Sequence, residues 1–223
     1  MSTVIVLAKA PVPGRVKTRL CPPFTPEEAA ALAAAALTDS LDIAAATGAD
    51  HLLLALDGEP GPELRRDYLD HGFARRPQAP GTLDVRIAAA FAEAARVDPG
   101  PALLIGMDTP QASASVLDDA LAGMADGRDA AFAPAEDGGF WALGLREPDH
   151  FRIVSLLLGV PMSRPDTGAI QLRRLENAGL DVLHLPMLRD VDTAYCAYAA
   201  AEQRPDTAFA RRLATISARI KSA

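Results

Sequence analysis

The sequence predicts an α/β fold, a three-layer sandwich in which helices cover both faces of a mostly parallel sheet. Short runs of uncharged apolar residues recur along the chain, as buried parallel strands require. Segments with apolar residues at helical spacing alternate with these runs, which is typical of parallel sheets. No repeat, low-complexity tract or linker divides the 223 residues, so we expect a single domain over residues 1–223.

Composition argues against several classes of protein. The net charge of −7 and the pI of about 5.1 are unlike those of nucleic-acid binders, which are usually basic. No apolar run approaches the roughly 18 residues of a membrane span, and the N-terminus lacks the pattern of a signal peptide. Two cysteines, Cys21 and Cys196, are too few for a disulfide framework. We therefore expect a cytoplasmic protein without nucleic-acid or membrane partners, and the oligomeric state stays open.

The first strand and the loop after it are the clearest indication of a binding site. Val4–Ala8 is an apolar run, and Pro11, Pro13 and Gly14 disfavour helix in the loop that follows. This loop carries four cations, which are Lys9, Arg15, Lys17 and Arg19. Open parallel sheets bind ligands beyond the carboxyl ends of their strands, and arginine and lysine hold phosphate oxygens well.

Phosphate binding by this loop depends on side chains, because the glycine patterns of the P-loop and of the dinucleotide-binding fingerprint are both absent. The alternative is a solvated basic loop without a ligand. We expect all four cations, Lys9, Arg15, Lys17 and Arg19, to bind nucleotide phosphates. Arg15, Lys17 and Arg19 should contact the phosphate chain directly, and Lys17 should also act in catalysis.

The elements after the loop alternate in type. Thr25 and Glu28 form a capping-box pattern, with Pro26 at the first helical position, and Ser113 is a further N-cap. The predicted helices cover residues 25–47, 63–71, 83–97, 113–125, 148–158, 167–178 and most of the chain after 193. The predicted strands cover residues 51–56, 73–76, 102–107, 130–133, 140–145 and 182–185.

Asp108 directly follows the uncharged strand over residues 102–107, so its carboxylate should enter the crevice at the end of that strand. Beside bound phosphates it would be a ligand of Mg²⁺, which prefers oxygen atoms. The alternative is an aspartate that caps the next turn, where Pro110 follows. We expect the metal role, and with it a part in catalysis.

Glu136, Asp137, Gly138 and Gly139 precede a strand that holds the only tryptophan, Trp141. Two glycines permit close approach of a ligand to the backbone, so we expect this segment to bind substrate. Asp-Gly is also a strong hairpin signal, and a tight turn can serve both purposes.

Three further aspartates lie near predicted helix starts. Asp190 and Asp192 alternate around Val191, which would place both carboxylates on one side of an extended segment and within reach of a metal. Capping of the last helical region is the favoured role for Asp192, and metal binding by either residue is the weaker hypothesis. Asp166 is expected to cap the helix that begins at Thr167.

Four motifs in this order resemble a bacterial family with a glycosyltransferase-A-like fold. They are AKAPVPGRVKTRL, GMDTPQ, PAEDGGFWALGL and RDVDT, and the resemblance extends from Val4 to about Tyr198. The segment 8–39 is also similar to 2-phospholactate guanylyltransferases and, more loosely, to molybdenum-cofactor nucleotidyltransferases. The resemblance implies a fold of the nucleotide-diphospho-sugar transferase type.

The resemblance also implies a divalent metal, Mg²⁺ or Mn²⁺, and a nucleotide substrate. In glycosyltransferases of this fold a D-x-D motif holds the metal and the ribose, and here Asp108 matches its second acid while Gly106 replaces the first. The family's usual label makes glycosyl transfer from a nucleotide-diphospho-sugar to a small-molecule acceptor the leading hypothesis. Nucleotidyl transfer from a nucleoside triphosphate to a phosphorylated acceptor is the alternative, which the four cations favour. The third hypothesis is a nucleotide-binding protein without catalysis.

Overall fold

A computed structural model describes residues 1–222 and contains seven strands and eight α-helices within this range. The strands are β1 Thr3–Lys9, β2 His51–Asp57, β3 Ala74–Pro77, β4 Ala102–Gly106, β5 Ala130–Pro134, β6 Phe140–Leu145 and β7 Val182–His184. The helices are α1 Pro26–Ala45, α2 Pro62–Asp70, α3 Leu83–Val97, α4 Ala114–Ala125, α5 His150–Leu157, α6 Thr167–Asn177, α7 Ala194–Gln203 and α8 Ala208–Ser222, and a 3-10 turn covers Thr18–Leu20.

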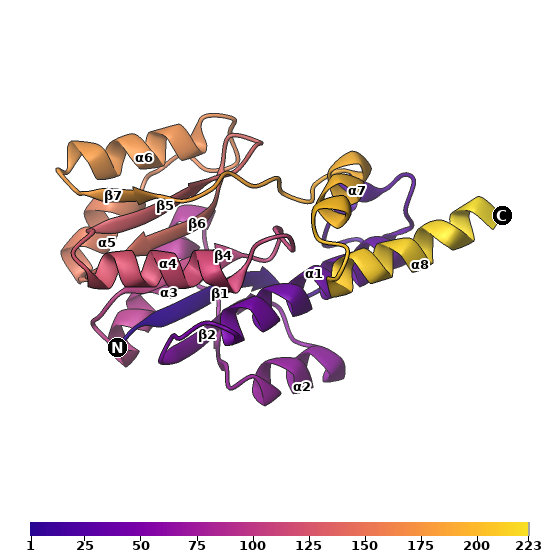
Figure 1. Ribbon diagram of the computed structural model, residues 1–223, viewed down its shortest axis with the longest axis horizontal. Coiled ribbons are helices and arrows are strands. Elements are labelled where there is room, and N and C mark those ends of the chain that lie inside the picture. Colours follow the sequence, from indigo (N-terminus) through magenta and orange to yellow (C-terminus); the bar gives the residue numbers. More distant parts are fainter. Residues whose placement is uncertain (223) are drawn as a thin grey trace.

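The seven strands form one sheet in the order β3-β2-β1-β4-β6-β5-β7 (Figure 1). All neighbours are parallel except β6, which runs antiparallel to both β4 and β5. The mostly parallel sheet expected from the sequence is therefore confirmed, and β5 and β6 add a hairpin to it. Because β1 and β4 are parallel neighbours, the loops that follow them begin side by side at the carboxyl edge.

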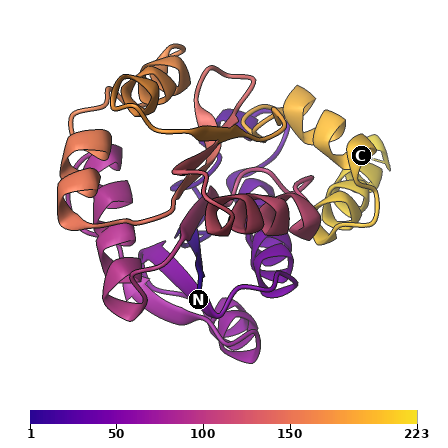
Figure 2. The same ribbon diagram turned by 60° about the vertical axis from the view of Figure 1, so that its left-hand side comes forward.

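Helices cover both faces of the sheet, as Figure 2 shows. Along β1, Val4 and Val6 pack into a core beneath α1 and α4, whereas Ile5 packs into a second core beneath α3 and α5. This alternation follows from the two-residue period of a strand. The interiors of the strands between these two cores therefore contain no charged residues, whereas the edge strand β3 carries Arg75 and Arg76.

A third apolar cluster lies beyond the sheet, where α7 and α8 pack together against one side of α1 (right in Figure 1). It includes Leu32 of α1, Phe209 of α8, and Leu20 and Phe24 from the segment that follows the cationic loop. The cluster therefore ties that loop to the C-terminal helices.

Several local predictions are confirmed, and others are wrong. Thr25 and Glu28 form the full capping box of α1, and Ser113 caps α4. The C-terminal helical region is two helices, because the chain turns at residues 204–207. Asp192 is not a cap, since the N-cap of α7 is the next residue, Thr193, whose side chain accepts the hydrogen bond from the Cys196 amide.

Asp166 occupies the N-cap position of α6, yet its side chain makes no capping hydrogen bond. Its two carboxylate oxygens instead accept hydrogen bonds from the Arg164 guanidinium. A bidentate bond to a charged donor is stronger than a bond to one amide, which explains why the capping prediction is wrong here.

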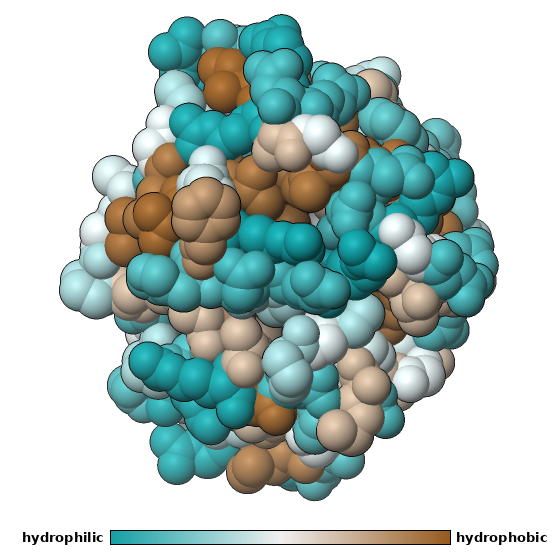
Figure 3. All heavy atoms as spheres, turned by 90° about the vertical axis from the view of Figure 1, so that its left-hand side faces the viewer, coloured by the Kyte–Doolittle hydropathy of each residue, from teal (hydrophilic) through white to brown (hydrophobic). Residues whose placement is uncertain are grey.

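The amino ends of the parallel strands lie at the opposite side of the molecule. Figure 3 views that side, where hydrophilic side chains cover most of the surface and surround a patch of hydrophobic ones. Within the described residues, every helix falls short of the length and apolar character needed to cross a bilayer.

Candidate functional site

A cavity of about 850 Å³ opens at the carboxyl edge of the sheet. Its walls come from the loops after β1, β3 and β4, from the turn between β5 and β6, and from the loop before α6. The volume lies within the usual range for small-molecule sites, and edges of this kind are where open α/β sheets bind ligands. The cationic loop and Asp108 both belong to this cavity.

Lys17 and Asp108 form the central contact of the site. Lys17 has a left-handed backbone with φ of 47°, which is uncommon for a residue with a side chain, and its own side chain is only 8% exposed. Its Nζ lies 2.7 Å from Asp108 Oδ1 and 3.3 Å from Asp192 Oδ1. Burial alone lowers the pKa of Lys17, but the charges of Asp108, Asp192 and Asp190 outweigh it, so the net pKa is raised.

Asp190 lies in the same cluster, where most of the neighbouring charged groups are also negative. Burial, and then the negative charges of Asp108 and Asp137, raise the pKa of Asp190 to about 7, although Lys17 acts in the opposite direction. Its Oδ1 is buried and has no hydrogen-bond partner among the described residues. Carboxylates near enough to raise one another's pKa, one of them with an unpartnered oxygen, could supply oxygen ligands to a hard divalent cation.

The backbone holds these aspartates together. The amide of Val191 donates a hydrogen bond of 2.9 Å to the main-chain carbonyl of Asp108, which joins the 189–193 segment to the end of β4. Gln111 supports this join from the side, because its Nε2 donates to the carbonyl of Arg189 at 2.6 Å. Residues about 80 positions apart in the sequence are thereby fixed beside one another.

The remaining loop cations differ in how they are engaged. Arg19 donates a 2.9 Å hydrogen bond to Asp192 Oδ2, so Asp192 bridges two of the cations that we expect to contact phosphate. Lys9 and Arg15 are exposed, line the cavity and form no ion pair with another described residue. The cavity therefore offers two unpaired cations next to the Lys17 cluster.

Gln78 and Arg86 also line the cavity, although neither was selected from the sequence. Gln78 Nε2 donates to the carbonyls of Ala8 and Ala55, and its Oε1 accepts a hydrogen bond from Arg86. Arg86 also pairs with Asp57 at 2.6 Å. Their position after β3, at the same edge as the cationic loop, is the signal that could have found them.

The Glu136–Gly139 segment forms the hairpin turn between β5 and β6, and it is divided between two roles. Asp137 and Gly139 line the cavity. Gly138 and Glu136 lie outside the lining residues, and Glu136 pairs with Arg189 at 2.6 Å. A side chain on Gly138 would place its Cβ 1.9 Å from the carbonyl oxygen of Pro165, so this glycine permits two backbones to pack together.

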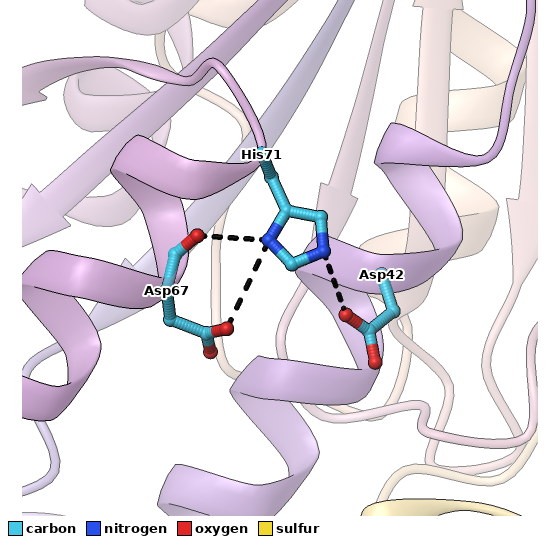
Figure 4. Close-up of side chains that lie close together, drawn as sticks. All are labelled: Asp42, Asp67 and His71. Atoms are coloured by element: carbon cyan, nitrogen blue, oxygen red, sulfur yellow. Dashed lines mark hydrogen bonds and ion pairs between the residues drawn. The ribbon is translucent and has the colours of Figure 1, made fainter.

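A second group of polar side chains lies away from the cavity, on α1 and α2 (Figure 4). It contains Asp42, Asp67 and His71, whose ligand atoms lie within 4.8 Å of one another. The imidazole lies between the two acids, with Nδ1 2.8 Å from the Asp67 main-chain carbonyl and Nε2 3.0 Å from Asp42 Oδ1. A carbonyl only accepts hydrogen bonds, so Nδ1 of His71 carries the hydrogen. The contacts of His71 with Asp67 and Asp42 join α2 to α1.

Residues 40–164, more than half of the chain, match a family model described as an uncharacterized protein conserved in bacteria, DUF2064. The chain belongs to this family. The matched region contains Asp108 and the β5–β6 turn, and it ends at Arg164 in the loop before α6. A search of curated proteins finds no match.

Solved structures similar to this DUF2064 chain have transferase folds. A candidate nucleotide-diphospho-sugar transferase from Desulfovibrio desulfuricans G20 is 27% identical, with a TM-score of 0.85 over 99% of this chain and 97% of that one. CMP:2-keto-3-deoxy-manno-octonic acid synthetase, solved with CTP, is 14% identical, with a TM-score of 0.56 over 92% and 100% of the two chains. A 4-diphosphocytidyl-2C-methyl-D-erythritol synthase from Anaerococcus prevotii DSM 20548 is 10% identical, with a TM-score of 0.56 over 90% and 96%.

These likenesses establish the fold of the DUF2064 chain as that of the nucleotide-diphospho-sugar transferases, as the sequence resemblance implied. The structure brings most of the residues selected from the sequence into one cavity. They are Lys9, Arg15, Lys17, Arg19, Asp108, Asp137, Gly139, Asp190 and Asp192.

Proposed function

We propose that this protein is a nucleotide-binding transferase that uses a divalent metal ion. The observation that carries the proposal is the meeting of the cationic loop after β1 with the carboxylates that follow β4 and β7. Lys9 and Arg15 are free to bind phosphate, whereas Asp108 and Asp190 offer oxygen ligands on the adjoining wall. The basic side chains would balance the charge of a nucleotide phosphate chain on one side. A metal ion held by the carboxylates would balance it on the other.

Asp108 and Asp190 are the residues that we propose to hold the metal, with Asp192 beside them. The unpartnered Oδ1 of Asp190 and the negative neighbours that raise its pKa support this choice. A bound Mg²⁺ or Mn²⁺ ion would supply positive charge where the phosphates are most negative. Lys17, which contacts Asp108 and Asp192 directly, would then be available to donate hydrogen bonds to phosphate oxygens.

Two reactions suit such a site. In glycosyl transfer an acceptor hydroxyl attacks the anomeric carbon of a nucleotide-diphospho-sugar and releases its proton to water. The bond to the diphosphate oxygen breaks, and the nucleoside diphosphate leaves with the electron pair. In nucleotidyl transfer a phosphate oxygen of the acceptor attacks the α-phosphorus of a nucleoside triphosphate, and pyrophosphate leaves. In both, Lys17 and the arginines stabilise negative charge that develops on the leaving phosphate.

The overall likeness to the Desulfovibrio protein, described as a candidate nucleotide-diphospho-sugar transferase, supports glycosyl transfer. A specific feature favours nucleotidyl transfer as the second candidate. Gly106 stands where the first acid of a D-x-D motif would be, and a side chain is therefore missing from the position that holds the ribose in glycosyltransferases of this fold. The four loop cations also suit the larger charge of a triphosphate.

A thermal-shift panel tests the proposal. Nucleoside triphosphates and nucleotide-sugars are added to the full chain with and without Mg²⁺ or Mn²⁺. A ligand that binds only the folded state at about 100 times its dissociation constant stabilises by about 2.7 kcal/mol. We expect at least one nucleotide to raise the melting temperature in a metal-dependent way, with triphosphates supporting nucleotidyl transfer and nucleotide-sugars supporting glycosyl transfer.

A matched pair of variants locates the nucleotide. Arg15→Ala should weaken nucleotide binding, whereas Arg66→Ala, an exposed arginine on α2 outside the cavity, should leave it unchanged. If no nucleotide shifts the melting temperature with either metal, the proposed function is wrong. Nucleotide binding without turnover across a broad acceptor screen would instead favour the non-catalytic alternative.

A further inference from the structure

The cavity has two halves, divided by the end of β4. The cationic loop after β1 and the segment after β3 form one half, on the side of the sheet that ends in β3. The β5–β6 turn and the loop at residues 161–167 form the other half, on the side that ends in β7. Asp108 lies between them, so a group transferred from the first half would pass it to reach the second.

The loop at residues 161–167 is held firmly against the β5–β6 turn. The Thr167 hydroxyl, which is buried, donates to the carbonyl of Pro161 and accepts from the Arg164 amide. The Gly168 amide donates to the carbonyl of Gly138 at 2.8 Å. This packing is tight, because a Cβ on Gly168 would lie 2.2 Å from the Gly139 carbonyl oxygen, and Ser163 adopts a left-handed φ of 59°.

Arg164 projects from this fixed loop and is the cation that lines the second half of the cavity among the described residues. Its Nε and Nη2 each donate a 3.0 Å hydrogen bond to the carboxylate of Asp166. Its Nη1 has no partner among the described residues. Asp166 therefore fixes the plane of the guanidinium and leaves one edge with free donors, an arrangement that suits recognition of a carboxylate or phosphate.

We propose that the second half of the cavity binds the second substrate of the transferase and that Arg164 recognises an anionic group on it, a phosphate or a carboxylate. The inference rests on the proposed function, since it needs the first half to hold the nucleotide. It defines the acceptor class as an anionic small molecule. Arg164 is then a specificity-determining residue, and Asp166 is a positioning residue that acts through it.

The test measures binding of inorganic phosphate and of acetate to the full chain, by thermal shift, with and without a saturating nucleotide and Mg²⁺. Four proteins are compared: the wild type, Arg164→Ala, Arg164→Lys and Arg173→Ala. Arg173 is an exposed arginine on α6 outside the cavity, so its variant makes the same change in net charge at a nearby position. Any general effect of salt on stability then appears equally in all four.

We expect Arg164→Ala to weaken binding of the preferred anion at least tenfold, Arg164→Lys to retain part of it, and Arg173→Ala to behave as wild type. Phosphate preference would identify a phosphorylated second substrate, and acetate preference a carboxylate. Equal anion binding by Arg164→Ala and Arg173→Ala would overturn the inference. Nucleotide binding separates the two proposals. Arg164→Ala should still bind nucleotide, because Arg164 is proposed to contact only the second substrate. If the wild type binds no nucleotide, the proposed function itself is wrong.

Discussion

Individual residues in the site are held by contacts that span the whole sequence. Lys17 reaches Asp108 and Asp192 from a left-handed backbone position, and the half-buried Asp190 adds a further acid beside them. The types of these residues and their places after strands could be predicted from the sequence. Their pairing could not, because the hydrogen bond that joins Val191 to Asp108 depends on how residues 189–193 return to the sheet.

Asp108→Asn tests the role of the central acid. The change keeps the shape of the side chain and removes the charge that Lys17 and a metal ion would share. We expect the protein to remain folded, to lose the metal-dependent part of nucleotide binding, and to lose at least about 100-fold in activity, since a single electrostatic contact is worth about that much. Calorimetric titration with a nucleotide, in the presence and absence of Mg²⁺, measures the metal-dependent part of binding.

Asp119→Asn is the control for this variant, because Asp119 is exposed on α4 and lies outside the cavity. It should bind nucleotide and metal as the wild type does. Retention of full metal dependence by Asp108→Asn would show that Asp108 is not the principal ligand.

At the scale of elements, the sequence was informative wherever local chemistry decides. The capping box at Thr25 and the continuous apolar strands appear as expected. The Asp-Gly pair signalled the hairpin that makes β6 antiparallel to β5, but the antiparallel pairing of β6 with β4 was not predicted, because a strand buried on both faces reads the same in either direction. It also did not reveal the contact of Gly138 with Pro165, since a glycine pair predicts close approach without saying by which partner.

Gly168→Ala should disturb the contact between α6 and the β5–β6 turn. Alanine favours helix by about 1 kcal/mol over glycine, but its Cβ would lie 2.2 Å from the Gly139 carbonyl oxygen. We expect a net loss of about 1–3 kcal/mol in the free energy of unfolding, as is usual for overpacking, measured by urea denaturation. Gly48→Ala is the control, since its Cβ would meet only Asp118 Oδ1 at 3.8 Å and should change stability far less.

The contact between α1 and α2 should depend on pH. Burial raises the pKa of Asp42, the charges of His71 and Arg211 oppose this, and Asp67 adds to it, so the net pKa lies above its unfolded value. The folded protein then holds a proton that the unfolded chain releases. The stabilising contribution is therefore present below the unfolded pKa and is lost as the pH rises through the folded one.

Asp42→Asn removes the titrating group, so this pH-dependent loss of stability should disappear. Its free energy of unfolding should rise relative to wild type as the pH increases from about 4 to about 6, by less than about 1 kcal/mol because Asp42 is half exposed. Urea denaturation at several pH values measures the difference, with the exposed Asp119→Asn as the reference. A constant difference over this range would rule out the proton linkage.

At the scale of the whole molecule, the predicted single domain over residues 1–223 implies that the chain unfolds in one cooperative step. The helix α1 contributes to the core of the sheet and to the α7–α8 cluster. Leu37 and Leu41 pack into the core beneath the sheet, and Leu32 packs into the cluster with α7 and α8. Asp39 of α1 also accepts hydrogen bonds from the amides of Ala208 and Phe209 at the start of α8. Neither core can lose α1 without affecting the other.

Phe209→Ala tests this coupling with two separate signals. Phe209 is buried in the α7–α8 cluster, whereas Trp141, the only tryptophan, is buried in the core beneath the sheet. Truncation of a buried phenylalanine costs about 3–5 kcal/mol. If the molecule is one unit, the variant should shift the denaturation midpoints of tryptophan fluorescence and of far-ultraviolet circular dichroism equally, and the two curves should coincide as in the wild type. If α7 and α8 form an independent unit, part of the helical signal will be lost at lower denaturant while the fluorescence midpoint stays where it was, and the single-domain prediction will be wrong.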